Sequence, residues 1–271
     1  MLTTYSNIQT SNRVVEECVF NYLKFITSLP KIEVHEMSDV FYVSADAPVF
    51  YFNSVFNARF NGNAKQKIES AKKFFRRRRR NSFTWHITPS SQPENLSELI
   101  TAQGGKLLES MPYLAVHLDD VPRDFPVPSN FDWKTVRTHE MLAAWISIYC
   151  RARGYPESTD KLFRIFSDLD LTESFPLQLI LGYLDDKPVS TYSVFMDREI
   201  VGFYSLTTLP EARGHGIGTA ISVAAADLAK EYGCRMAMLL SEPPSRNICK
   251  RLGFVDGFGD MDIYRLSLSQ S

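Results

Sequence analysis

The stretch RGHGIGT, residues 213–219, places three glycines at alternate positions behind an arginine and directly before a helical pattern. Glycine inside a helix costs roughly 0.5–1 kcal/mol relative to alanine, so its repetition here needs another reason. Backbone N–H groups exposed by glycines, together with the positive end of a helix dipole, form a binding site for anions. The spacing therefore indicates a phosphate or pyrophosphate site, to which Arg213 adds a cation and Thr219 a hydroxyl. We expect His215, within the loop, to point to solvent.

Two better-known phosphate motifs do not fit this stretch. A nucleotide P-loop has the form G-x-x-x-x-G-K-[ST], and no lysine stands between Gly218 and Thr219. A dinucleotide fingerprint has the form G-x-G-x-x-G near the start of a βαβ unit, whereas these glycines are two residues apart and lie late in the chain. The pattern that remains is R-x-x-G-x-G, formed by Arg213, Gly216 and Gly218.

The loop must be held between a strand and a helix, and the surrounding sequence predicts both. Apolar residues over 177–209 predict three strands, with turns at Asp185-Asp186 and Asp197-Arg198. The small and apolar residues after Thr219 predict a helix that ends near Gly233. The other elements expected in this half are helices at 138–154, 158–171 and 243–254 and strands at 234–240 and 259–268.

The first half shows a related order of elements without the glycine motif. The order strand, turn, short helix, strand occurs at 82–118 and again at 234–268, which leaves related folds and chance as alternatives. The elements expected in this half are a helix at 14–29, β-prone aromatic residues at 33–60, a basic helix at 63–80, a strand at 82–88, a short helix within 89–105 and a hairpin at 106–118.

The segment 119–133 has the composition of a linker. It contains three prolines with polar neighbours, which is typical of a boundary between folding units. We therefore predict an N-terminal domain at 1–122 and a C-terminal domain at 133–271, joined by a linker at about 119–132.

Length and composition indicate an ordinary globular protein. Its 271 residues can bury a sizeable core, and its acidic and basic residues nearly cancel, so net charge indicates no particular partner. Four widely spaced cysteines without a C-x-x-C pair are typical of free thiols in a reducing compartment. The first residues lack the features of a secretory signal, and no apolar run approaches the ~20 residues of a membrane helix. The scattered histidines form no metal motif, so we expect no metal site. Together with the cysteines and the lack of a signal or membrane segment, this leads us to expect a cytoplasmic protein with no membrane contact.

The stretch TTLPEARGHGIGTAISVAAADLAKEYGCRMAMLLSEPPSRNICKRLGF resembles the acyl-CoA core of the GNAT superfamily of N-acetyltransferases. The resemblance covers about 133–268 and depends on Pro210, the loop at 213–219, the helix after it and the RLGF at 251–254. More faintly, PVFYFNSVF and FTWHITPSSQPENLSELITAQGG resemble the N-terminal domain of tandem GNAT proteins, which lacks the motif. The resemblance implies an α/β (α+β) fold with a mixed, mostly antiparallel sheet flanked by helices, preceded by a smaller related domain.

Acetyl-CoA is the acyl donor that the resemblance implies. Its pyrophosphate would lie on the N–H groups of 213–219, and its pantetheine arm would pair with the splayed end of the strand at 204–208. Backbone donors of Leu206 and Thr208 would serve its amides and polarise the thioester. The residues implied for the cofactor are Leu206, Thr207, Thr208, Arg213, Gly214, His215, Gly216, Ile217, Gly218, Thr219 and Asn247.

One residue departs from the family pattern. Many members carry a tyrosine five residues before the phenylalanine of GF, as general acid for the leaving thiolate, and Cys249 stands there in this chain. A thiol with a pKa of about 8.5 matches the basicity of the coenzyme A thiolate and could donate the proton. Cys249 could equally be a packed apolar residue.

The acceptor side gives weaker signals. Glu199, Tyr204 and Glu242 lie near the ends of the motif strands and are candidates for the group that removes the amine proton, although solvated or structural roles fit them too. The segment 149–163 lies where such folds wrap the acceptor, which makes Tyr155 and Glu157 candidates for substrate contact or residues of a plain surface loop.

The run Arg76–Arg80, preceded by Lys72 and Lys73, is the strongest charge feature. It fits a solvated helix end, or an anion site for nucleic acid, acidic lipid or an acidic partner. No base-reading motif accompanies it.

We therefore expect an acetyl-CoA-dependent N-acetyltransferase in which a small-molecule or peptide amine attacks the thioester directly in a ternary complex. The N-terminal domain would shape the acceptor cleft or a homodimer. The alternatives are a catalytically impaired acyl-CoA-binding scaffold or regulatory module, which Cys249 suggests, and a nucleic-acid or anion binder acting through Arg76–Arg80.

Overall fold

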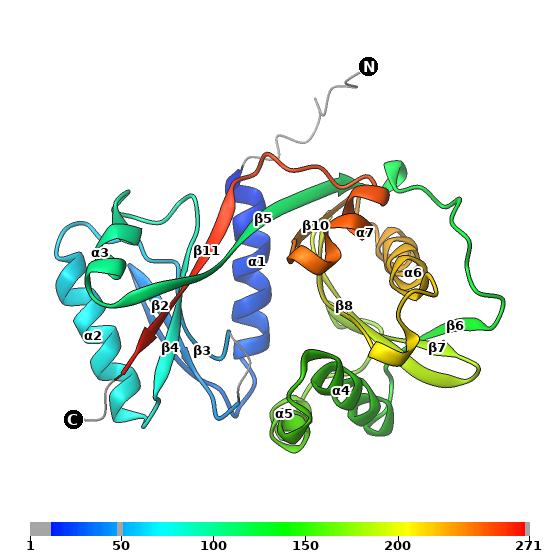
Figure 1. Cartoon of the computed structure of the whole chain (residues 1–271), viewed down its shortest axis with the longest axis horizontal. Helices are drawn as coiled ribbons and strands as arrows, with labels where there is room; N and C mark the ends of the chain where they lie inside the picture. Colours follow the sequence, from blue (N-terminus) through cyan, green and yellow to red (C-terminus); the bar gives the residue numbers. More distant parts are fainter. Residues whose placement is uncertain (1–11, 48–50, 269–271) are drawn as a thin grey trace.

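Eleven strands form one continuous sheet in the computed structural model, which describes residues 12–47 and 51–268 (Figure 1). The strand order is β1-β2-β3-β4-β11-β5-β10-β9-β8-β7-β6, and most neighbours run antiparallel. The parallel neighbours are β3 with β4 and β9 with β10. Helices flank the sheet, so the fold is the mixed, mostly antiparallel α/β architecture that was expected.

The sheet carries two lobes, which lie at the left and the right of Figure 1. We call N-terminal lobe the part built from α1–α3, β1–β4 and β11, and C-terminal lobe the part built from α4–α7 and β6–β10. The N-terminal lobe contains α1 (Asn12–Thr27), β1 (Glu33–Met37), β2 (Val40–Ser44), β3 (Asn53–Phe56), α2 (Ala64–Arg77), β4 (Ser82–Ile87), α3 (Leu96–Ala102) and β11 (Asp260–Ser267).

The C-terminal lobe holds the glycine loop. It lies between β9 and α6, as the sequence predicts. This lobe contains β6 (Phe131–Thr135), α4 (His139–Arg153), α5 (Thr159–Phe166), β7 (Leu177–Leu184), β8 (Lys187–Asp197), β9 (Ile200–Thr208), α6 (Ile217–Glu231), β10 (Met236–Leu240) and α7 (Arg246–Arg251), with short 3₁₀ turns at Pro156–Ser158, Pro210–Ala212 and Pro243–Ser245.

The two lobes exchange strands. The strand β5 (Gly105–His117) pairs with β11 through its first half and with β10 through its second half. The last strand, β11, lies between β4 and β5 and so completes the N-terminal lobe rather than the C-terminal lobe that precedes it in sequence. The expected division into 1–122 and 133–271 stays a prediction, and the pairing adds that residues 260–267 belong to the sheet of the first lobe.

The expected hairpin at 106–118 is wrong. The chain runs straight through Pro112 as one 13-residue strand, because each half of it has a different partner and no turn is needed. Proline lacks an N–H group, and it stands here where β5 leaves β11 and passes to β10. The short strand β6, which begins at the end of the expected linker and continues into the expected C-terminal domain, was not predicted.

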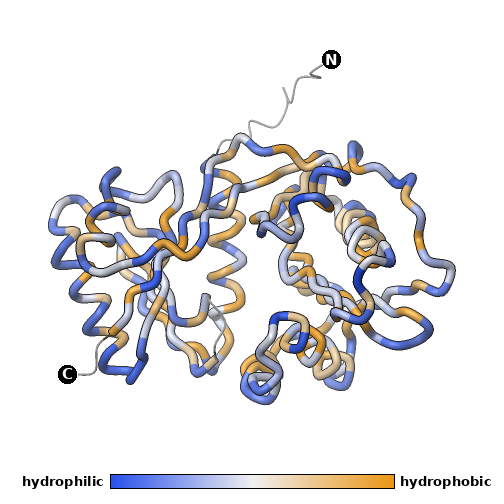
Figure 2. Tube along the Cα trace, in the orientation of Figure 1, coloured by the Kyte–Doolittle hydropathy of each residue, from blue (hydrophilic) through white to orange (hydrophobic). Residues whose placement is uncertain are grey.

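The lobes share an apolar core. The helix α1 packs against the C-terminal lobe, where the Tyr22 ring stacks on Tyr204 at 3.8 Å between centroids and lies 5.6 Å from Phe195. Buried residues of α1, β2, α4 and β8 form one cluster, so side chains from both lobes pack against each other. Figure 2 shows apolar residues on the inner side of these helices.

The other predicted helices and strands are confirmed to within a few residues, and both predicted turns are confirmed, with Asp185, Asp186 and Arg198 at positive φ. The repeated order also holds, since β4, α3 and β5 follow one another as β10, α7 and β11 do. Two of the stretches used above, the first residues of the chain up to position 11 and positions 48–50 of PVFYFNSVF, lie outside the described residues.

Candidate functional site

The C-terminal end of β9 separates from its neighbour. The parallel pairing between β9 and β10 stops at Gly202 and Met238, whereas β9 continues to Thr208. A bulge marks this point, because the register with β8 shifts and Ser205 adopts a φ of 56°. In the part of the chain that the structure describes, the edge of residues 203–208 that faces β10 has no strand partner. Its backbone groups are open to a ligand.

The glycine loop exposes a row of backbone donors. Gly214 and Gly216 have φ values of 82° and 79°, a conformation that side chains disfavour, and Gly216 is the N-cap of α6. Among residues 12–47 and 51–268, no backbone acceptor is found for the N–H groups of residues 214–218, while Thr219 and Ala220 donate to the Gly216 carbonyl. A Cβ on Gly214 would meet open space. The loop therefore fits the diphosphate that its sequence predicts.

Arginines secure this loop on both sides. Arg213 Nε donates to the Thr208 carbonyl at 3.0 Å and its Nη2 to the Ala152 carbonyl at 3.3 Å, which ties the loop to β9 and α4. Arg251 Nη2 donates to Thr219 Oγ1 at 3.0 Å. His215 is exposed, as expected. Arg251 places a second cation at the loop, which the sequence analysis did not single out.

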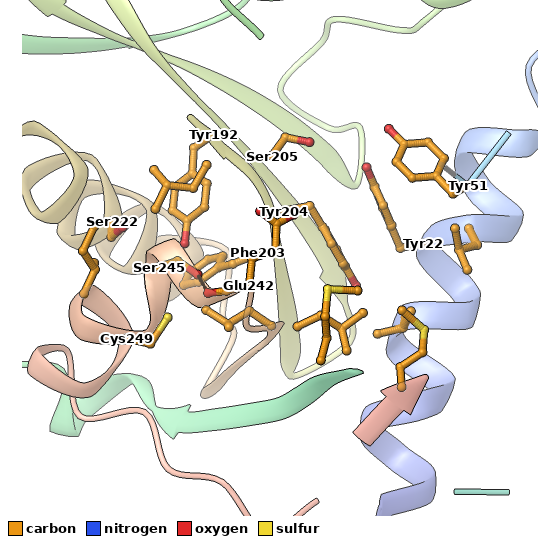
Figure 3. Close-up of a pocket in the computed structure, with 18 of the residues that line it drawn as sticks. Tyr22, Tyr51, Tyr192, Phe203, Tyr204, Ser205, Ser222, Glu242, Ser245 and Cys249 are labelled. Carbon is orange, nitrogen blue, oxygen red and sulfur yellow. Dashed lines mark hydrogen bonds between the residues drawn. The ribbon is translucent and has the colours of Figure 1, made fainter. Parts of the chain in front are cut away.

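A cavity opens beside the free edge of β9 (Figure 3). Both lobes line it, because α1 contributes Tyr22, and Tyr51 before β3 and Phe56 at the end of β3 also face it. Its polar lining groups are tyrosines, serines, one histidine, one thiol and one ion pair, set among apolar side chains. The polar lining residues are Tyr22, Tyr51, His86, Tyr149, Arg153, Tyr192, Tyr204, Ser205, Ser222, Glu242, Ser245 and Cys249.

Cys249 faces this cavity from α7 and is 3% exposed. Ser241 Oγ lies 4.0 Å from its sulfur. Burial raises the pKa of the thiol above its ordinary value, so it stays protonated at neutral pH. A protonated thiol at this wall can donate a proton, and its role as acid stays a prediction.

Tyr192 lines the same wall from β8 and was missed by the sequence analysis. Burial raises the pKa of its hydroxyl, Cys249 adds to the rise, and both side chains line the cavity. The sequence analysis placed it within the predicted strands of 177–209 and assigned it no role. Figure 3 shows its ring directed from β8 toward Ser245.

Tyr204 is half-buried and packs against the N-terminal lobe. Its hydroxyl contacts Met238 Sδ at 3.7 Å and its ring stacks on Tyr22. Burial raises the pKa of Tyr204 well above its ordinary value, so the phenol remains protonated. A group that holds its proton this firmly is a poor base.

Glu242 lies at the carboxyl end of β10, close to the free end of β9. Arg153 of α4 holds it with two contacts from Nη1, at 2.8 Å to Oε1 and 2.7 Å to Oε2. Both side chains line the cavity and are half-buried. Glu199 does not join them: it directly precedes β9, six residues before Ser205 and roughly 20 Å away at strand rise, and lies near Arg235. Of the two carboxylates, only Glu242 faces the cavity.

The remaining candidates lie around this centre. Leu206 lines the cavity, while Thr207 and Thr208 bond with Thr191 and Ser190 of β8. Asn247 is exposed on α7. Tyr155 packs edge-on against Tyr149, one ring behind the wall, and Glu157 is exposed at the outer end of α4.

The family comparison matches the C-terminal lobe. Residues 142–254 match the model of the Acetyltransferase (GNAT) family, and this range includes the glycine loop, β9, β10 and α7. A search of curated proteins gave no match.

Solved structures resemble the whole chain. A GCN5-related N-acetyltransferase from Kribbella flavida is 17% identical, with a TM-score of 0.71 over 97% of this chain and 96% of that one. A GCN5-related N-acetyltransferase from Sphaerobacter thermophilus is 15% identical, with a TM-score of 0.62 over 86% and 82%. A tandem GNAT protein from the clavulanic acid biosynthesis pathway is 14% identical, with a TM-score of 0.58 over 94% and 96%. These likenesses show the fold of both lobes.

Two searches for other features were negative within the described residues. No helix there is long and apolar enough to cross a membrane. No group of three or more histidine, cysteine or acidic residues there could hold a metal ion.

Proposed function

Residues 142–254 form a domain of the acetyltransferase (GNAT) family, and on this premise we propose that the protein transfers an acetyl group from acetyl-CoA to a primary amine. The observation that carries the proposal is the juxtaposition of the free edge of β9, the open N–H groups of 214–218 and the cavity between them and α7. Acetyl-CoA would supply an activated thioester.

The chain's own groups would hold the donor at two places. The N–H groups of residues 214–218 and the α6 dipole would bind the diphosphate, with Arg251 adding positive charge. The edge of 203–208 would pair with an extended amide-containing arm, and its N–H groups near the bulge at Ser205 would stabilise the oxyanion.

Protons would be transferred by side chains that line the cavity. Glu242 would accept the proton of the amine, directly or through water, because it is the carboxylate that faces the cavity. Cys249 or Tyr192 would return a proton to the departing thiolate, since both stay protonated beside each other at the α7 wall.

The acceptor would enter between the lobes. Tyr22, Tyr149 and Tyr204 form an aromatic wall there, and α1 of the N-terminal lobe contributes part of it. We infer that the N-terminal lobe shapes the acceptor cleft. The four buried free thiols support a reducing compartment such as the cytoplasm as the place of action.

Calorimetric titration of acetyl-CoA tests the proposed binding site. We expect the Arg213→Ala, Gly216→Asp variant to bind at least tenfold more weakly, because a side chain at Gly216 is strained and would approach the Pro126 carbonyl at 3.3 Å. Gly233→Asp is the matched control, since it adds the same side chain at a φ of 85° after the other end of α6, in open space. Equal affinity of the loop variant and the control would refute the assignment.

A second candidate function is a binding module without turnover, and Cys249 at the position of the expected tyrosine favours it. Release of free coenzyme A thiol in the presence of amines distinguishes the two. Tight binding of acetyl-CoA without release by any of a broad panel of amines would support the binding module.

A further inference from the structure

A groove separate from the cavity runs between α2 and the β1–β2 edge of the N-terminal lobe. It has a volume of about 600 Å³, within the ~300–1,000 Å³ range of small-molecule sites. None of its lining residues is shared with the cavity beside β9. They are His35, Met37, Tyr42, Asn63, Gln66, Lys67, Ser70, Lys73, Phe74, Arg77 and Arg78.

Positive charge is in excess in this groove. Lys67 pairs with Asp39 at 2.7 Å, and Arg78 pairs with Glu33, so these two cations are neutralised. Lys73 and Arg77 have no acidic partner among the described residues. Other acidic groups nearby are engaged elsewhere, since Glu69 pairs with Lys72 and Glu36 with Lys24. Two unpaired cations one helical turn apart therefore face the groove.

A buried hydroxyl also faces it. Tyr42 is only 2% exposed, yet its hydroxyl has no hydrogen-bond partner in the described structure. A buried polar group without a partner costs about 1–3 kcal/mol, and such groups are rare in folded proteins. A ligand that accepts a hydrogen bond from this phenol would remove the cost.

Aromatic rings form the wall next to these donors. The exposed His35 ring lies 5.8 Å from the Phe74 ring and 5.9 Å from the Tyr42 ring, and Phe74 lies 5.0 Å from Tyr42. The guanidinium of Arg78 also lies over the Phe74 ring, 3.5 Å from its centroid. The open His35 face is thus available to stack on a planar ring.

From these observations, we propose that the groove binds a mononucleotide. Its phosphates lie between Lys73 and Arg77, and its base stacks on the wall formed by His35, Phe74 and Tyr42. The chemistry recognised is a planar heteroaromatic ring joined to phosphate. This site is independent of the proposed acetyl transfer and lies in the other lobe.

The arginines of the run Arg76–Arg80 differ in their position relative to the groove. Arg77 and Arg78 line it, whereas Arg80 turns away to Asp46 at 3.6 Å. Arg76 and Arg79 are exposed outside it. The five arginines thus do not form a single patch, and the ligand-facing charge comes from Arg77 together with Lys73.

Calorimetric titration of ADP into the full chain tests the proposal. We expect Lys73→Ala, Arg77→Ala to weaken ADP binding at least tenfold. The matched control, Arg76→Ala, Arg79→Ala, removes the same charge from the same segment outside the groove and should change the affinity less than twofold. Equal weakening by both variants, or by neither, would overturn the proposal, the second because ADP then binds elsewhere.

Two further measurements keep the test sharp. Tyr42→Phe should weaken ADP binding about three- to tenfold while leaving the melting temperature of the free protein unchanged or higher, because it removes an unpaired buried hydroxyl. Pyrophosphate should bind at least tenfold more weakly than ADP. If pyrophosphate binds as tightly as ADP, the ring-stacking wall has no role and the nucleotide assignment fails.

Discussion

At the scale of single residues, proton transfer is the open chemical question. Cys249 and Tyr192 share one wall of the cavity, and burial raises the pKa of both. A raised pKa keeps the acid form populated to higher pH, so the rate is maintained through neutrality and falls only as pH rises through the raised value.

We expect Cys249→Ala to lower kcat about 100-fold with little change in the KM for acetyl-CoA, the scale of a lost general acid. In the wild type, the rate should fall at a pH above the ordinary pKa of a thiol. In Cys249→Ala, the pH at which the rate falls should change. Cys234→Ala is the control, because Cys234 is also a buried thiol with a pKa raised to about 11 but does not line the cavity. If Cys249→Ala keeps full activity and Tyr192→Phe loses it, the tyrosine is the acid.

Glu242→Gln should lower kcat by about 100-fold, because an amide cannot accept the proton of the amine. The amide keeps the size of the side chain and can still contact Arg153, so binding of acetyl-CoA should persist. Glu199→Gln removes the other candidate carboxylate, which lies outside the cavity, and should be neutral. A pH–rate profile of each variant decides, and unchanged kcat in Glu242→Gln would exclude it as the base.

At the scale of elements, the bulge in β9 creates the free edge. Ser205 holds a left-handed conformation, which costs a non-glycine residue roughly 1–2 kcal/mol. We expect Ser205→Val to destabilise the fold by about 1–2 kcal/mol, because a β-branched side chain disfavours positive φ, and to weaken acetyl-CoA binding at least fivefold. Ser205→Gly, which tolerates the conformation, should retain the affinity. Denaturant unfolding and calorimetry measure both, and equal affinity in the two variants would contradict a role for the bulge.

Local patterns were sufficient for most elements and for the glycine loop. Hydrophobic periodicity and turn-forming residues can be recognised within a short stretch of sequence. These signals predicted α4, α6 and the turns at Asp185-Asp186 and Asp197-Arg198. The bulge at Ser205 carries no such signal, because serine does not mark a left-handed position. The choice between Glu199 and Glu242 needed the parallel pairing of β9 and β10, which puts the end of β10 beside the free end of β9.

In the molecule as a whole, the pairing of β5 with β10 and of β11 with β4 could not be predicted from short stretches of sequence. The pairing of β11 with β4 joins residues about 180 positions apart, and no sequence window contains both. The same limit applies to the N-terminal lobe's part in the cavity, since Tyr22 reaches Tyr204 only after the lobes pack. From the sequence alone, the candidates for contact with the acceptor were Tyr155 and Glu157, which both lie in the C-terminal lobe.

The exchange predicts that residues 1–122 do not fold by themselves. Without β11, the edges of β4 and β5 lose their partner, and Ile263, Tyr264 and Leu266 leave the core. We expect this fragment to show little near-UV circular dichroism and no cooperative unfolding, in contrast to the full chain. A synthetic peptide of residues 258–271 should restore part of the signal when added. Cooperative unfolding of the fragment without the peptide would contradict the prediction.

The position of β11 also bears on biosynthesis. A ribosome makes the first lobe's helices and four of its strands well over a hundred residues before it makes residues 260–267. Nascent chains normally fold their first domain early, but here the gap between β4 and β5 stays open until residues 260–267 have been made. We infer that during translation the edges of β4 and β5 remain unpaired until β11 has been made. In a stalled or prematurely terminated polypeptide, these edges are exposed to chaperones and proteases.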